Sequence, residues 1–233
     1  MPTVRIDRRF CGPPDSGNGG YVCGLLARAL GGSDCEVTLH RPPPLDRDLR
    51  IEIQGDAASL TDGATVIASA VRALVDVAVP PPPSLAEADS ASMRFTGRTG
   101  HIFPTCFVCG PDRAEGDGLR IFAGLAKDGT DQVATTWTPD PSLLDAEGLI
   151  RSEFVWAALD CPGYFAVEQR AHPAVLGRLA VNIHEPRVGP RPLIVTGWPI
   201  ASDGRKHRAG TALHDADGRL LAAGSATWIT LRP

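Results

Sequence analysis

The sequence predicts an α+β fold in which one structural unit occurs twice. Its 233 residues, 43% of them hydrophobic and 21% charged, are enough for one large globular domain or two of ordinary size. A proline-rich segment at residues 79–92 divides the chain, and each part holds an apolar helical stretch followed by alternating strand patterns. We therefore expect two units, residues 1–90 and 91–233, each with an antiparallel sheet wrapped around one long buried helix.

Each unit is predicted to contain one helix that is apolar on nearly all sides. The stretch GGYVCGLLARAL spans residues 19–30, and SEFVWAALDCPGYFAV spans residues 152–167. A helix without a polar face is typical of a buried position. Both helices are therefore expected to lie inside the protein, against the strands of their own unit.

The strand patterns that follow the two helices match each other. Residues 35–53 (CEVTLHRPPPLDRDLRIEI) and 179–197 (LAVNIHEPRVGPRPLIVTG) each read as a strand, a His-x-Pro motif, a short loop and a second strand. An Asp-Gly turn follows in each unit, at Asp62 and Asp203, and leads into a further strand. Asp217 begins another Asp-Gly turn, which predicts a final hairpin in the second unit.

Charge and cysteine usage limit the classes of function. A net charge of −4 argues against a general nucleic-acid binder, and no stretch approaches the ~18 apolar residues of a membrane span. The N-terminal MPTVRIDRRF has no apolar signal-peptide core, so we expect a cytoplasmic protein with reduced cysteines. Cys106 and Cys109 form a C-x-x-C motif without a second pair, so a zinc site would lack half its ligands. We expect neither a metal nor a cofactor.

The residues at the start of the first helix, Asn18-Gly19-Gly20-Tyr21, are unusually rich in glycine. Glycines leave the first helical amides uncovered, and such amides attract negative charge. A phosphate-binding loop is excluded because no Gly-Lys-Ser/Thr follows and no spaced-glycine dinucleotide motif is present. Two interpretations remain: the amides stabilise an oxygen that becomes anionic in a reaction, or the glycines only allow close packing.

Asp160 lies in the apolar stretch AALDCPG of the second helix. A buried aspartate is rare unless it is paired or functional, because burying a charge is costly. Burial would raise its pKa and make it a better general base. The alternative is that Asp160 merely ends the helix ahead of Pro162, where a negative charge is electrostatically unfavourable.

The order of these segments resembles that of acyl-CoA thioesterases with the double hotdog fold. NGGYVCGLLARAL, VTLHRPPPLDRDLRIEIQ and LTDGATVIASAV resemble the N-terminal half of the acyl-CoA thioesterase II family, and SEFVWAALDCPG resembles its second half. CFVCGPDRAEGDGLRI, at residues 106–121, is similar to a segment that opens many phenylacetate-type hotdog thioesterases. Together these stretches cover most of the chain.

The resemblance implies hydrolysis of an acyl-CoA thioester by water, with acyl-CoA as the partner and further association into a homo-oligomer. It makes Asp160 the catalytic carboxylate, facing an oxyanion and substrate site formed by Asn18, Gly19, Gly20 and Tyr21. The family also uses a Thr and a Gln beside its carboxylate. AVLGRLAVNI and LLAAGSATWI contain no Gln, and Ser225 or Thr227 is the substitute for the Thr. The alternative is a non-catalytic acyl-CoA or acyl-ligand binding protein that has lost the water-holding residues.

The two units differ at the residues that would form this site. Aligning GGYVCGLLA with SEFVWAALD places Ala27 opposite Asp160, and Arg151-Ser152-Glu153 opposite Asn18-Gly19-Gly20. A two-fold arrangement would create two composite sites, of which one has both the glycines and the carboxylate. We therefore expect one active site per chain.

Three basic features are weaker candidates. His40 and His184 occupy the same place in the two repeats, which indicates a structural role at a strand end. The stretch GRKHR at residues 204–208 is expected to be a solvated turn, with contact to CoA phosphates as the alternative.

Overall fold

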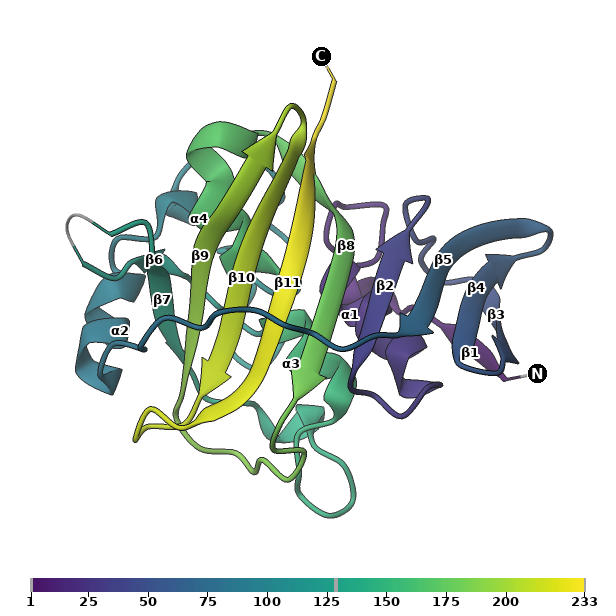
Figure 1. Cartoon of the computed structure of the whole chain (residues 1–233), viewed down its shortest axis with the longest axis horizontal. Coiled ribbons are helices and arrows are strands. Elements are labelled where there is room, and N and C mark those ends of the chain that lie inside the picture. Colours follow the sequence, from purple (N-terminus) through teal and green to yellow (C-terminus); the bar gives the residue numbers. More distant parts are fainter. Residues whose placement is uncertain (1, 128–129, 233) are drawn as a thin grey trace.

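The computed structural model describes residues 2–127 and 130–232, and its strands form one continuous antiparallel sheet (Figure 1). The strand order is β1-β3-β4-β5-β2-β8-β11-β10-β9-β7-β6. The strands are β1 (Thr3–Arg5), β2 (Cys35–Leu39), β3 (Asp48–Gln54), β4 (Ala57–Asp62), β5 (Thr65–Arg72), β6 (Gly124–Leu125), β7 (Val133–Trp137), β8 (Ala174–Ile183), β9 (Leu193–Asp203), β10 (Lys206–His214) and β11 (Leu220–Thr230).

The two predicted units meet in the middle of this sheet. Strand β2 pairs with β8, from Cys35 opposite Val181 to Thr38 opposite Arg178. The α+β class holds, but the expectation of two separate sheets has to be corrected to one. The physical reason is that each unit alone would leave a strand edge unpaired, and joining β2 to β8 satisfies both edges. The unit boundary at residue 90 stays a prediction.

The three predicted Asp-Gly turns all connect neighbouring antiparallel strands. Gly63 lies between β4 and β5, Gly204 between β9 and β10, and Gly218 between β10 and β11. Their φ angles are 59°, 53° and 83°, a region that glycine adopts without steric cost. These turns fix the register of the hairpins that build both halves of the sheet.

The helices are α1 (Gly19–Arg28), α2 (Leu85–Ser92), α3 (Ser152–Ala158) and α4 (Cys161–Ala171). The long helix predicted from residue 152 is therefore interrupted, with Asp160 between α3 and α4 at φ −82° and ψ −81°. Pro162 explains the break, because it has no N–H and its ring clashes with the carbonyl of Ala158 in a continuous helix. The break turns Asp160 away from a regular helical position.

The helices α1, α3 and α4 cover one face of the sheet. Helix α1 contacts β2, β5 and β8 and packs against α3, while α4 contacts β9 and β10 (Figure 1). Leu26 of α1 and Phe154 and Trp156 of α3 are fully buried, and Phe154 packs against Tyr21 of α1. The core therefore lies between the helices and the sheet, as the apolar sequences of both stretches predict.

The segment that joins the two halves runs in front of β11 and β8 in Figure 1, while the helices lie behind them. It is shorter than predicted, because Leu85–Ser92 form helix α2. Ser84 Oγ accepts a hydrogen bond from the amide of Glu87, and the amide of Ser84 donates to the Glu87 carboxylate. This reciprocal cap follows from the Ser-x-x-Glu sequence at the helix start.

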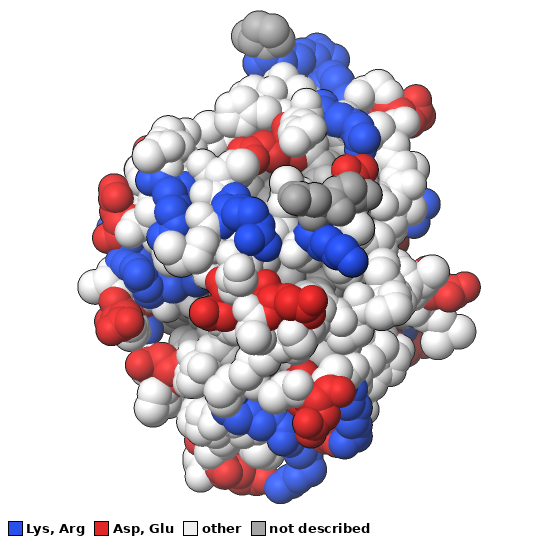
Figure 2. Space-filling model, turned by 90° about the vertical axis from the view of Figure 1, so that its left-hand side faces the viewer, with Lys and Arg blue, Asp and Glu red and all other residues white. Residues whose placement is uncertain are grey.

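The charged residues on the surface, and the lengths of the helices, are those expected from the charge and hydropathy of the sequence. Figure 2 shows basic and acidic side chains interspersed on the face that it presents, in keeping with the small net charge. Within residues 2–127 and 130–232, no helix has the length and apolar character needed to cross a bilayer.

Candidate active site at the start of helix α1

Asp160 is held against the start of α1 by two hydrogen bonds. Its Oδ2 accepts one from the amide of Gly20 at 2.9 Å and one from Asn18 Nδ2 at 2.8 Å. Asn18 is also the N-cap of α1, and its Oδ1 accepts from the amide of Tyr21 at 2.9 Å. The structure thus brings together the glycine-rich helix start and the carboxylate that the sequence analysis singled out.

Close packing between α1 and α3 accounts for Gly20. A Cβ atom there would lie 2.5 Å from Asp160 Cβ and 2.9 Å from the carbonyl oxygen of Trp156. At Gly24, one turn later, a Cβ would lie 2.6 Å from Glu153 Cα. The packing interpretation therefore applies at Gly20, and its amide is occupied by Asp160 instead of being open to a substrate.

The amide of Gly19 is the helix-start donor that remains. No described residue accepts a hydrogen bond from it, whereas the amides of Asn18, Gly20 and Tyr21 each have an acceptor. Gly19 lines a cavity of about 300 Å³ together with Asn18 and Asp160. The positive end of α1 therefore contributes an unsatisfied N–H group at the wall of this cavity.

Asp160 contributes an unsatisfied acceptor to the same wall. Its Oδ1 is buried and has no hydrogen-bond partner among the described residues, and the residue as a whole is 2% exposed. Burial raises the pKa of Asp160 to about 7, although the hydrogen bond from the Gly20 amide acts in the opposite direction. A carboxylate with a pKa near neutrality and a free oxygen is suited to accept a proton from water.

The cavity is apolar apart from this polar end. Its apolar wall consists of Leu39, Ile102, Phe103, Tyr164, Leu176, Trp228 and Ile229. Exposed His40 and Arg41 also line it, so the cavity reaches solvent beside them. A largely apolar cavity with a few convergent polar groups is typical of a small-molecule binding site.

Three residues of the predicted site, Ser225, Thr227 and Tyr21, are not among the described residues that line the cavity. Trp228 and Ile229, of the same strand as Ser225 and Thr227, do line it. Side chains alternate along a strand, so Thr227 of β11 points to the opposite face from its buried neighbours Ala226 and Trp228. The side chain of Tyr21 also points elsewhere, since its ring stacks on Phe10 in the core with a centroid distance of 4.2 Å.

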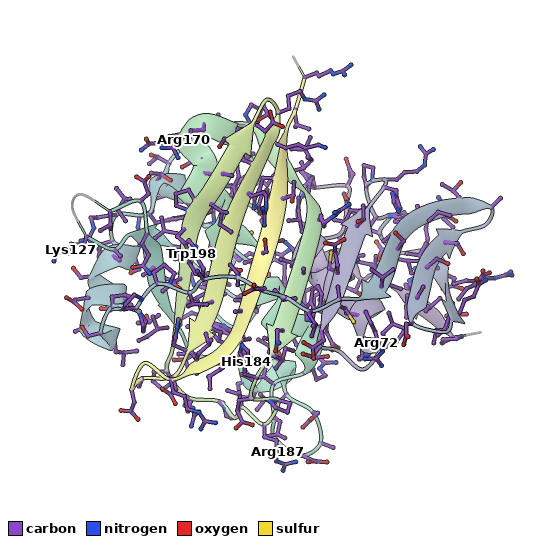
Figure 3. All side chains as sticks on the ribbon, in the orientation of Figure 1. Arg72, Lys127, Arg170, His184, Arg187 and Trp198 are labelled. Atoms are coloured by element: carbon purple, nitrogen blue, oxygen red, sulfur yellow. The ribbon has the colours of Figure 1, made fainter. Side chains whose placement is uncertain are left out.

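Of the weaker basic candidates, His40 lines the cavity, whereas His184 and residues 204–208 do not. His40 lines the cavity, and its Nε2 lies 2.8 Å from Ser69 Oγ. His184 is not among the lining residues, and Figure 3 shows it at the far end of β8. Residues 204–208 form the β9–β10 turn and the start of β10, and they do not line the cavity either.

An ion pair replaces the site at the other end of the α1–α3 pair. Arg28 Nη1 lies 2.8 Å from Oε1 of Glu153, whose side chain is 2% exposed. Ala27, the neighbour of Arg28, is the residue that the alignment of the two helices places opposite Asp160. Across the described part of the chain, the glycine-rich helix start and the facing carboxylate therefore meet at one end of this helix pair.

Three cysteines lie next to Asp160 in the cavity wall. The sulfur atoms of Cys106, Cys109 and Cys161 are within 4.8 Å of one another, and all three residues are buried. Hydrogen bonds from the Cys109 and Cys161 thiols, with further ones from backbone amides, hold the pKa of Cys106 well below its usual value. The sequence analysis missed this group, because Cys161 is far in sequence from the C-x-x-C pair and belongs to helix α4, whereas the pair lies in a loop.

Comparison with known proteins identifies the fold. No protein-family model matches the chain, and no curated protein matches its sequence. A candidate thioesterase II from Thermobifida fusca aligns with 99% of this chain and 92% of its own at 18% identity and a TM-score of 0.63.

Two further solved structures each cover 99% of this chain. The tesB protein of Mycobacterium avium subs. paratuberculosis aligns over 92% of its own chain, at 14% identity and a TM-score of 0.62. A conserved protein of unknown function with a hot dog fold, from Alicyclobacillus acidocaldarius, aligns over 93% of its chain, at 13% identity and a TM-score of 0.66. The chain therefore has a hot dog fold, which confirms the hotdog part of the expectation drawn from the resemblance.

Proposed function

We propose that this protein is a thioesterase that hydrolyses an acyl-CoA thioester with water activated by Asp160. The observation that carries the proposal is that two residues with unpaired polar groups line the same cavity: the buried Oδ1 of Asp160 has no hydrogen-bond partner, and the amide of Gly19 donates to no acceptor, among the described residues. A proton acceptor and a fixed amide donor are the two groups that attack of water on a carbonyl requires. The thioesterase II name of one of the full-length structural neighbours supports the same assignment.

The reaction follows from these two groups. Asp160 Oδ1 takes a proton from a water molecule while the water oxygen attacks the thioester carbonyl carbon. The amide of Gly19, at the positive end of α1, donates a hydrogen bond to the oxyanion that forms. The carbon–sulfur bond then breaks, and the leaving thiolate takes up the proton from Asp160. Asn18 and the amide of Gly20 hold Oδ2, so that Oδ1 keeps its direction during these steps.

The cavity suggests where the two parts of the substrate lie. The apolar wall accepts the acyl group, and the thiol part extends toward the exposed His40 and Arg41. A guanidinium at the mouth is a suitable partner for a CoA phosphate. Arg41 replaces the 204–208 segment in this role, because that segment does not line the cavity.

A second candidate function is binding of an acyl ligand without hydrolysis. The observation in its favour is that Ser225 and Thr227 do not line the cavity, so β11 offers no hydroxyl from these two residues to hold the attacking water. Asp160 alone would then have to position the water.

A panel of acyl-CoA thioesters separates the two functions. Thiol release is measured for short, long and aromatic acyl groups, and binding of the same compounds is measured by calorimetry. Turnover of at least one compound that depends on Asp160 supports the thioesterase. Binding without turnover across the panel supports the binding protein and contradicts hydrolysis.

The place of CoA is tested with Arg41→Gln. This change should raise KM about tenfold for an acyl-CoA and leave kcat unchanged, since one charge-assisted contact contributes ~1.5 kcal/mol. KM for the N-acetylcysteamine thioester of the same acid, which lacks phosphates, should not change. Arg205→Gln, in the β9–β10 turn, is the matched control and should alter neither value. Equal effects of Arg41→Gln on both substrates would contradict a phosphate contact.

A further inference from the structure

We infer that Cys106, Cys109 and Cys161 form a binding site for one zinc ion in the cavity wall. Their three sulfur atoms lie within 4.8 Å of one another, and the Cys106 and Cys161 sulfurs are 3.9 Å apart. In a tetrahedral zinc–thiolate centre with Zn–S bonds of about 2.3 Å, the sulfurs are about 3.8 Å apart. The Cys106 and Cys161 sulfurs are thus already spaced as two corners of such a centre, and the Cys109 sulfur lies within 4.8 Å of both.

The backbone around the first two cysteines is shaped to present both sulfurs together. The amide of Gly110 donates to the carbonyl of Cys106 at 2.9 Å, which closes the turn over Cys106–Gly110. A Cβ at Gly110 would lie 2.5 Å from the carbonyl oxygen of Pro104 and 2.6 Å from the amide nitrogen of Cys106. Only glycine fits this turn, so the Cys-x-x-Cys-Gly sequence has a geometric reason that packing of two thiols alone does not require.

Neighbouring donors are placed to support negatively charged sulfur. The amide of Phe103 donates to His101 Nδ1 at 2.9 Å, so we assign the ring proton to Nε2. That Nε2 lies 3.3 Å from Cys109 Sγ, and Asn18 Nδ2 lies 3.8 Å from Cys106 Sγ. Three thiolates and one zinc carry a net negative charge, which donors of this kind offset. His101 therefore acts on the ligand Cys109, and the fourth zinc position is left to solvent from the cavity.

Zinc is the ion that this ligand set favours. Three buried thiolates form a soft site, which selects zinc over magnesium or calcium. The site would join Cys161, the first residue of α4, to the segment between Arg98 and Gly124, which contains no helix or strand. Long segments of this kind usually need another constraint or serve a function. The metal would fix this segment as one wall of the cavity.

Metal content and absorption spectra of the reduced full-length protein test the inference. Protein produced with added zinc should contain one zinc per chain. Replacement by Co²⁺ should give visible bands of tetrahedral cobalt and a near-ultraviolet thiolate-to-cobalt band. Reduced wild-type protein that takes up neither metal overturns the inference, as does cobalt binding without the thiolate band. These measurements do not involve turnover. The zinc site can therefore fail while the thioesterase activity is found, and the activity can fail while zinc is bound.

Single substitutions locate the site. Cys106→Ser and Cys161→Ser should each reduce the zinc content from one per chain to near zero. Cys35→Ser is the matched control, because Cys35 is also buried and its thiol donates to the carbonyl of Ser33 at 3.2 Å, which a serine hydroxyl can replace. Full zinc content in a folded Cys161→Ser protein, or equal loss in Cys35→Ser, contradicts the assignment. If a variant fails to fold, the wild-type cobalt spectrum still decides.

Discussion

Replacing Asp160 with asparagine should abolish most turnover and at the same time stabilise the protein. The amide oxygen of an asparagine can accept both hydrogen bonds that Gly20 and Asn18 now give to Oδ2. The substitution removes the proton acceptor and the buried charge, and it places an NH₂ group where the unpartnered Oδ1 now lies. Turnover should fall by ~10²-fold or more, the usual contribution of a general base.

The gain in stability can be worked from the pKa of Asp160. Its pKa is about 7 in the folded protein and 3.8 in the unfolded chain. The folded state therefore binds the proton more tightly, and the free energy of unfolding falls as pH rises from about 4 to about 7. A difference of about 3 pKa units corresponds to a loss of about 4 kcal/mol in the free energy of unfolding, and this loss is complete above pH 7. Asp160→Asn removes this penalty and should raise the free energy of unfolding at pH 8 by up to about 4 kcal/mol.

Both effects are measured on the same variant. Thioester hydrolysis is followed by thiol release, and stability by urea denaturation at pH 8 and pH 5, where the gain should be smaller. Asp217→Asn, an exposed aspartate in the β10–β11 turn, is the matched control and should change neither. Wild-type turnover in Asp160→Asn would refute the role of Asp160 as base. Unchanged stability at pH 8 would refute the statement that the buried, ionised Asp160 destabilises the folded protein.

Three further substitutions probe the helix pair and one buried histidine. Gly20→Ala places a Cβ 2.5 Å from Asp160 Cβ, which should cost ~1–3 kcal/mol of stability and lower turnover by displacing the carboxylate. Arg28→Met leaves the buried Glu153 without its 2.8 Å partner and should cost ~3 kcal/mol in urea denaturation, with turnover unchanged. Burial lowers the pKa of His214 to about 4, so the unfolded chain binds the extra proton below about pH 6.5. Stability should therefore fall by up to ~3 kcal/mol from pH 6.5 to pH 4, and His214→Gln should remove that loss.

Matched variants separate these effects from general disturbance. Gly189→Ala meets no atom closer than 3.8 Å and should leave stability and turnover unchanged. Arg47→Met breaks a 2.9 Å ion pair whose Asp62 partner is 25% exposed, and should cost less than ~1 kcal/mol. An equal loss of stability in Arg28→Met and Arg47→Met would contradict the idea that burial of Glu153 makes the Arg28–Glu153 pair more important than an exposed one. A pH profile of His214→Gln that matches the wild type would assign the acid-side loss to other groups.

Much of the fold follows from local patterns in the sequence. The Asp-Gly turns fix hairpins because glycine alone adopts their φ angles without cost. The position of α1 follows from its apolar sequence and its Asn18 cap. The break at Asp160 and the helix at residues 85–92 were also encoded, by Pro162 and by the Ser84–Glu87 capping box. The prediction of one long helix gave more weight to the apolar pattern on both sides of Asp160 than to Pro162. The prediction of a linker at residues 79–92 gave more weight to the run of prolines than to the capping box.

The site was less accessible to sequence reasoning, because its parts come from distant segments. The pairing of the α1 start with Asp160 came from a family resemblance, and the hydrogen bond to Gly20 shows that the two do meet. Because the amide of Gly20 donates to Asp160, the amide of Gly19 is the one without an acceptor among the described residues. The sequence alone does not distinguish between these two neighbouring glycines. The side to which Thr227 points depends on which face of β11 is turned toward the helices, and the contact of Cys161 with Cys106 depends on how α4 is placed against a loop.

The joining of the two units through β2 and β8 also limits how copies of this chain can associate. The outermost strands of the sheet are β1 and β6, which contain three and two residues. A neighbouring molecule that extends the sheet by strand addition would find only a few backbone groups to pair with at either border. Such short borders protect a sheet from uncontrolled growth into larger aggregates. We therefore expect that, where copies of this chain associate, they do so through helices, loops and sheet faces, where side chains instead of backbone groups decide which partner fits.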